Sequence, residues 1–127
     1  MTGLDRVVVV VAGLFGAAGV GLAAAGSHET ADNLSIAADF LLFHAAALIG
    51  LAALGLIVPA RRLVLAAALV LAMATILFAG DLVLRFYTDE RLFPFAAPLG
   101  GSGLMLGWVL VAVAGLWPAS KRPDGTA

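Results

Sequence analysis

Cysteine is absent from this 127-residue chain, and charged side chains are scarce. The lack of thiols excludes disulfides and thiolate metal sites. Asp, Glu, Lys and Arg together make up 12% of the residues, whereas soluble domains carry about 25%. So few charges cannot cover a surface that faces water, and we therefore expect a single domain surrounded by the lipid bilayer. The formal net charge of −1 gives no indication of nucleic-acid binding.

Motifs of known catalytic chemistry are also missing. An HExxH pair would indicate a metalloprotease, a P-loop a nucleotide-binding protein and a GxSxG turn a serine hydrolase. The sequence contains none of these motifs. We therefore expect no enzymatic activity and predict no cofactor. His28 and His44 could ligate a metal or bracket a haem, but two histidines at unrelated spacing are a weak signal.

The chain does contain abundant apolar sequence, 63% of its residues. Four stretches lack acidic and basic side chains for the roughly 18–20 residues that a membrane-spanning helix needs. Because hydrocarbon offers the backbone no hydrogen-bond partners, each stretch is expected to be helical. The sequence predicts an all-α, four-helix transmembrane bundle that forms one integral membrane domain over residues 1–127. The predicted helices cover residues 5–26, 36–58, 62–87 and 98–117.

Basic residues predict the orientation of the bundle, because they favour the cytoplasmic side of a membrane. If both termini are cytoplasmic, the outer side carries at most Arg85 and Arg91. The inner side then carries Arg6, Arg61, Arg62, Lys121 and Arg122. We therefore predict an N-in, C-in topology for a multi-pass protein of the bacterial cytoplasmic (inner) membrane.

Small residues are grouped on two of the predicted helices. Gly13, Ala17 and Gly21 fall four apart on one face of the first helix, and Gly103 and Gly107 form a GxxxG pair in the fourth. Small side chains let helix backbones approach closely in lipid. Two interpretations stay open for these faces, tight packing within the bundle and association of the protein with another copy.

The polar groups of the predicted helices can be placed by depth, using a helical rise of about 1.5 Å per residue. With the topology above they all gather in the outer half of the bilayer. The apolar inner half offers no polar path, which argues against a transporter or proton relay. A charged group at membrane depth is normally turned inward and partnered, so we predict a polar pocket near the outer surface. Its candidate residues are His28, Asp39, His44, Asp81, Arg85 and Ser102.

Partners within this pocket follow from helical spacing. Asp81 and Arg85 lie four apart with the acid first, the favourable order for a helical ion pair. Asp39 and His44 lie about 140° apart around one helix and need partners from elsewhere. For His44 we expect His28 or Asp81, and for Asp39 either Arg85 or a loop group. Alternatively, Asp39 is an interfacial acid favoured by the dipole at the start of its helix.

We hypothesise that His28 and His44 face this common pocket, closed by the turn at residues 98–102. In the simpler alternative the pocket only fixes helix packing through hydrogen bonds. In the other it binds a metal, a haem or a quinone-like headgroup.

The order of several short motifs resembles a known family. The family's first helix ends in Gly-small-His, and its second carries an aromatic residue before a histidine. Its third helix has Phe-small-Gly-Ser, and its fourth opens with Thr-Pro-x-Gly-Gly before a later Gly-Trp. The corresponding residues here are Gly26-Ser27-His28, Phe43-His44, Phe78-Ala79-Gly80-Asp81, Ala97-Pro98-Leu99-Gly100-Gly101 and Gly107-Trp108.

From about Gly13 to Trp117, the chain thus resembles the small membrane proteins of domain-of-unknown-function family 423, which are related to the transmembrane protein 256 family. The resemblance implies a four-helix membrane protein and no particular activity. Two departures stand out: Asp81 replaces the usual serine, and Arg85 has no usual charged counterpart.

The expected function is that of a non-enzymatic accessory, assembly or structural subunit of a larger membrane complex. The expected partners are the lipid bilayer and either other membrane subunits or further copies of the chain, with no nucleic acid. The alternative is a membrane protein that binds a small molecule, metal or haem through His28 and His44 in the outer-leaflet pocket.

Overall fold

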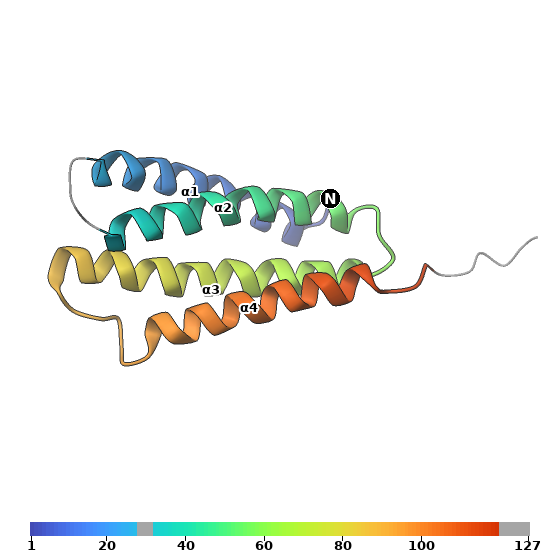
Figure 1. The fold of residues 1–127 in the computed structure, drawn as a ribbon. Coiled ribbons are helices and arrows are strands. Elements are labelled where there is room, and N and C mark those ends of the chain that lie inside the picture. The colour runs from blue at the N-terminus through green and yellow to red at the C-terminus, as the bar shows by residue number, and fades with distance from the viewer. Residues whose placement is uncertain (28–31, 120–127) are drawn as a thin grey trace, which may run out of the picture.

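A computed structural model describes residues 1–27 and 32–119 of the chain. These residues form four helices, α1 (Gly3–Gly26), α2 (Asp32–Gly55), α3 (Arg61–Thr88) and α4 (Ala96–Gly115) (Figure 1). All four are long and apolar enough to cross a membrane. The prediction of an all-α, four-helix transmembrane protein is therefore confirmed.

Helix boundaries differ most from the prediction at α2, which begins at Asp32 rather than at residue 36 and ends at Gly55 rather than at residue 58. The polar first turn is helical because Asp32 favours the positive end of the helix dipole and the Ser35 hydroxyl donates to the Asp32 carbonyl oxygen over 3.0 Å. At α4, Pro98 lies in the first turn, where its missing N–H leaves no hydrogen bond unmade.

The helices follow one another as an open array. Each helix packs on the next in sequence, and α1 also approaches α3. No Cα atom of α4 lies within 8 Å of one in α1 or α2 across the described residues. Figure 1 accordingly shows α1 and α4 at opposite edges, with α2 and α3 between them. The bundle is thus not closed on all sides, and α4 is attached mainly through α3.

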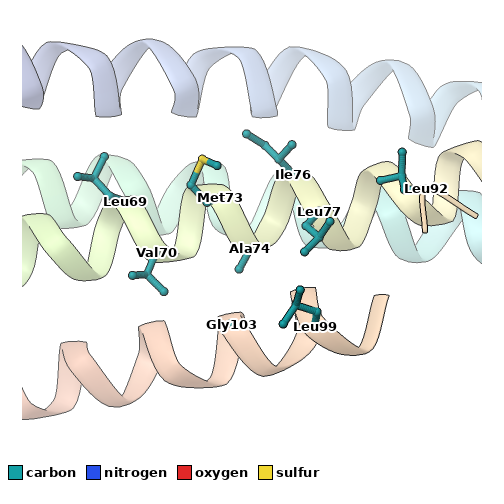
Figure 2. A pocket seen from close by; sticks show the side chains of 9 residues that line it. All are labelled: Leu69, Val70, Met73, Ala74, Ile76, Leu77, Leu92, Leu99 and Gly103. Carbon is teal, nitrogen blue, oxygen red and sulfur yellow. The ribbon is translucent and has the colours of Figure 1, made fainter. Parts of the chain in front are cut away.

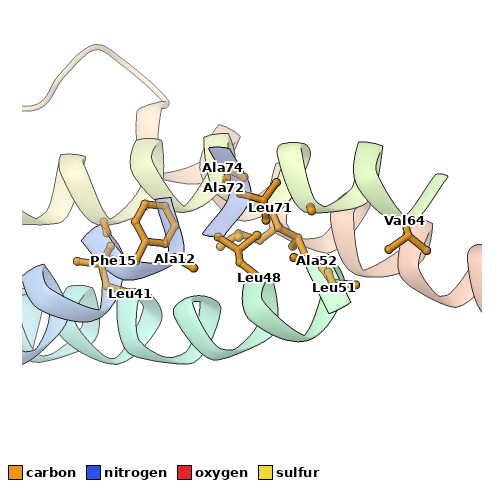
Figure 3. Close-up of a cluster of buried hydrophobic side chains, with 14 of the residues drawn as sticks. Ala12, Phe15, Leu41, Leu48, Leu51, Ala52, Val64, Leu71, Ala72 and Ala74 are labelled. Atoms are coloured by element: carbon orange, nitrogen blue, oxygen red, sulfur yellow. The ribbon is translucent and has the colours of Figure 1, made fainter. Parts of the chain in front are cut away.

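The apolar core lies where α1, α2 and α3 meet (Figure 3). Phe15 from α1, Leu41 and Leu48 from α2, and Val64 and Leu71 from α3 are all buried there. Apolar burial supplies little association energy in lipid, so close packing has to hold these helices together.

Glycines create the close contact between α3 and α4. A Cβ atom at Gly100 would lie 2.7 Å from the backbone nitrogen of Phe78. At Gly103 and Gly107 it would lie 2.9 Å from Ala74 Cβ and 2.6 Å from the Leu71 side chain. The structure therefore places the GxxxG pair of α4 inside the bundle, against α3.

On α1 the expected small-residue stripe lies elsewhere. A Cβ atom at Gly13 or Gly21 would meet nothing within 4 Å, and Ala17 is exposed. The close contact with α2 is made by Gly19, where a Cβ atom would lie 2.7 Å from Leu42. Packing within the bundle is therefore the wrong interpretation of this stripe, because Phe15 and Gly19 set the face that α1 turns to α2.

Candidate functional site

An ion pair that the sequence did not predict joins the ends of three helices. Arg61 Nη2 at the start of α3 lies 2.5 Å from Asp5 Oδ2 in α1. Its Nη1 donates to the Gly55 carbonyl oxygen at the end of α2 over 3.1 Å. Asp5 is almost completely buried and forms a capping box with Thr2. The Thr-x-x-Asp pattern before an apolar run indicates this cap, but it does not indicate the contact with Arg61.

A second ion pair lies near the C-terminal end of α3. Arg85 Nη2 lies 2.5 Å from Asp81 Oδ2, so the expected pairing is present. Asp81 is fully buried, and its Oδ1 accepts a hydrogen bond from the Leu92 backbone N–H over 2.9 Å. The carboxylate therefore also fixes the loop between α3 and α4, which spacing within one helix could not indicate.

His44 joins α2 to α4 through its imidazole ring. Nδ1 lies 2.8 Å from the Phe40 carbonyl oxygen, and Nε2 lies 3.3 Å from Trp108 Nε1. An indole nitrogen can only donate and a carbonyl oxygen can only accept. The ring is therefore neutral, with its proton on Nδ1 and its Nε2 lone pair directed at Trp108. This side-chain bridge connects two helices whose backbones stay apart.

The partners expected for His44 are corrected by this geometry. Asp81 is paired with Arg85 rather than with His44, and His28 lies outside the described residues. With both ring nitrogens already bonded, His44 could ligate a metal or haem only by releasing Trp108. The described residues also contain no group of three His, Cys, Asp or Glu side chains placed to hold a metal ion.

A groove of about 910 Å³ lies beside this bridge, between α2 and α4, with Phe78 of α3 contributing to its wall. Its lining is Asp39, Phe40, Phe43, His44, Phe78, Gly101, Leu104, Met105, Trp108 and Val109. The groove thus brings together Asp39 and His44 from the predicted pocket, along with Gly101; residues 98–102, expected as a turn, belong to the start of α4. We call it the α2/α4 groove.

The remaining candidates lie outside this groove. Ser102 is exposed, and its hydroxyl donates back to the Pro98 carbonyl oxygen over 2.8 Å. The Asp81–Arg85 pair does not line the groove, and Arg85 forms no salt bridge with Asp39. The predicted polar pocket is therefore divided into a buried ion pair at the loop and an aromatic groove with one carboxylate.

Two further grooves are lined almost entirely by apolar side chains. One of about 580 Å³ lies between α3 and α4, bordered by residues such as Met73, Leu77 and Leu99 (Figure 2). The other, of about 520 Å³, lies between α1 and α3 and is bordered on the α1 side by Leu14, Phe15 and Ala18. Neither offers acid–base or metal chemistry.

Comparison with known proteins gives one family. The family described as "Protein of unknown function (DUF423)" matches residues 12–101. The chain is 28% identical over 120 residues to the UPF0382 inner membrane protein YgdD of Escherichia coli strain K12, covering 86% of this chain and 88% of the relative. The YgdD proteins of Escherichia coli O157:H7 and Shigella flexneri match with the same identity and coverage. No solved structure matches the chain.

Proposed function

The chain belongs to the DUF423 family of unknown function and is an integral membrane protein of this uncharacterised family, and we propose that it is a non-enzymatic accessory subunit. It is a multi-pass protein of the cytoplasmic membrane, like the inner membrane protein YgdD that it resembles. In this proposal it binds a transmembrane helix of another membrane protein along the outward face of α1.

The observation that carries the proposal is an exposed face of α1 on which three small residues follow one leucine. Leu14, Ala17, Ala18 and Gly21 are spaced as i, i+3, i+4 and i+7, so they share one helix face, and all are exposed. Small residues allow a second helix to approach closely in lipid. We call these residues the α1 face.

The α1 face is continuous with a recess that could receive larger side chains. Leu14 and Ala18 line the groove of about 520 Å³ between α1 and α3. A partner helix on this face would place its backbone against Ala17 and Gly21 and its apolar side chains in the groove. Such a surface allows close backbone approach and tight van der Waals packing, which favour helix association in lipid.

The buried polar groups support a structural rather than a chemical role for the protein. Asp5 binds Arg61, Asp81 binds Arg85, and His44 binds Trp108. The first and third contacts join helices, and Asp81 also holds the loop through the Leu92 backbone N–H; none of these contacts leaves a reactive atom aimed at an open site.

The test compares the same substitution at two glycines that lie on different helices. Gly21 and Gly50 both have open space beside them, Gly21 on the α1 face and Gly50 on the exposed side of α2. Tagged wild-type protein, Gly21→Leu and Gly50→Leu are purified in mild detergent, and co-purifying proteins are measured by quantitative mass spectrometry. We expect a stoichiometric membrane protein with the wild type and Gly50→Leu, and at least a tenfold loss with Gly21→Leu.

Two results would contradict the accessory role. A complex that contains only copies of this chain would make the protein a homo-oligomer. Equal recovery of the partner with both leucine variants would remove the α1 face from the interface. An absorption spectrum of the same preparation addresses the alternative of ligand binding, since a Soret band or a stoichiometric bound metal would favour a haem or metal protein.

A further inference from the structure

We propose that the α2/α4 groove binds an amphipathic organic cation, with its positive centre beside the carboxylate of Asp39 and its apolar part along the aromatic wall. The inference is independent of the accessory role, because the groove lies between α2 and α4 whereas the proposed docking face lies on α1. It assigns a ligand class to a groove whose lining includes a carboxylate.

Asp39 is an acid without a protein partner among the described residues. Within the described residues it forms no salt bridge and no hydrogen bond, although it lies seven residues into α2, about 10 Å along the helix axis by the usual rise. That position is beyond the first turn, so the helix dipole does not explain it. Asp5 and Asp81, by contrast, each pair with an arginine.

Asp39 is exposed where it lines the groove, so its carboxylate is accessible to a charged ligand. Water at the groove mouth can solvate it when the groove is empty, and a cation would replace that water with direct electrostatic attraction. A metal ion is not the expected partner, because no second acid or free imidazole lines the groove with Asp39.

Aromatic rings form much of the groove wall. Phe40 and Phe78 lie with ring centroids 4.6 Å apart, and Phe43 and Trp108 lie 6.1 Å apart. All four rings line the groove. The face of an aromatic ring attracts an organic cation, tryptophan most strongly. An ammonium or phosphonium centre therefore finds both a carboxylate and π faces in one groove.

The size and position of the groove indicate an amphipathic rather than a small hydrophilic cation. Its volume of about 910 Å³ falls within the roughly 300–1,000 Å³ of small-molecule sites. Beyond Asp39 and His44 the wall is apolar, with Leu104, Met105 and Val109. Gly101 leaves this space open, since a Cβ atom there would meet nothing within 4 Å.

The experiment uses two probes of the same shape and opposite charge, tetraphenylphosphonium and tetraphenylborate. Binding to the purified full-length protein in a neutral detergent is measured by equilibrium dialysis and by quenching of tryptophan fluorescence. We expect the phosphonium to bind and the borate not to bind. Asp39→Asn should weaken phosphonium binding at least tenfold, and Asp32→Asn, on the exposed first turn of the same helix, should leave it unchanged.

Gly101→Leu provides a steric test that does not depend on charge. Its side chain would enter the open space of the groove, so phosphonium binding should be lost while the fluorescence spectrum and gel-filtration volume of the protein stay unchanged. Asp39→Glu should restore most of the affinity lost in Asp39→Asn. The proposal is overturned if the wild type does not bind the phosphonium, if Asp39→Asn binds it equally well, or if the borate binds with similar affinity.

Discussion

Replacing Gly100 by alanine should separate α3 from α4, whereas the same change at Gly101 should not. A Cβ atom at Gly100 would lie 2.7 Å from the Phe78 backbone nitrogen and 2.9 Å from its Cα. Both atoms belong to the backbone of α3, so no rotamer change can relieve the contact. The two helices must move apart by several tenths of an ångström. At Gly101 a Cβ atom meets nothing within 4 Å.

The expected magnitude follows from two opposing terms. Alanine is favoured over glycine in a helix by about 1 kcal/mol, and this gain applies to both positions. Overpacking costs about 1–3 kcal/mol, and this loss applies only to Gly100→Ala. The free energies of unfolding of the two variants should therefore differ by about 1–3 kcal/mol, with Gly101→Ala the more stable.

The assay is an SDS titration of the protein in mixed micelles, followed by tryptophan fluorescence. Trp108 in α4 reports directly on the contact of this helix with the rest of the protein. Equal unfolding midpoints for the two alanine variants would refute the close α3–α4 packing. A lower midpoint for Gly101→Ala than for Gly100→Ala would refute it as well.

Three further predictions concern the ion pairs and the topology. Arg85→Leu should destabilise the protein by about 3–5 kcal/mol, and more than Asp81→Asn combined with Arg85→Leu, because it leaves a buried charge without a partner. Arg61→Leu should destabilise it strongly for the same reason, since it strands Asp5; the SDS titration measures both. A cysteine introduced at Ser120 should react with membrane-impermeant maleimide only from the cytoplasmic side, because the distribution of basic residues predicts that both termini lie inside.

A control variant and two contradicting outcomes make these predictions testable. Arg62 is exposed beside the partly buried Arg61, so Arg62→Leu should change stability little and serves as the control. A double variant less stable than Arg85→Leu alone would contradict the pairing at the C-terminal end of α3. Labelling of the introduced cysteine from the periplasm would overturn the N-in, C-in topology, and the absence of native cysteine removes any background.

The sequence was sufficient to predict the fold, because each helix forms its backbone hydrogen bonds within itself. The length of each apolar stretch therefore indicates the length of the helix. Helix ends were less certain where polar residues continue a helix, as Asp32 and Ser35 do at the start of α2. The Asp81–Arg85 pair was predictable because spacing of four within one helix fixes its geometry. These are local properties, and local rules were enough to find them.

Contacts between helices were not predictable in this way. His44 meets Trp108, which is 64 residues away, and the sequence carries no signal of which helix faces α2 at that level. The same holds for the contact of Arg61 with Asp5. The stripe of Gly13, Ala17 and Gly21 indicated a close-packing face, but the rotation of α1 about its axis decides whether that face points inward.

The accessory role is tested most directly by photo-crosslinking in living cells. A photoreactive amino acid is placed at Ala17 on the α1 face, or at Gly50 on the exposed side of α2 as the control. We expect irradiation to join the Ala17 variant to one protein other than itself, giving a single adduct whose mass differs from twice 12.8 kDa, and to give no such adduct at Gly50. An adduct of two copies of this chain, or the same adducts from both positions, would contradict the accessory role.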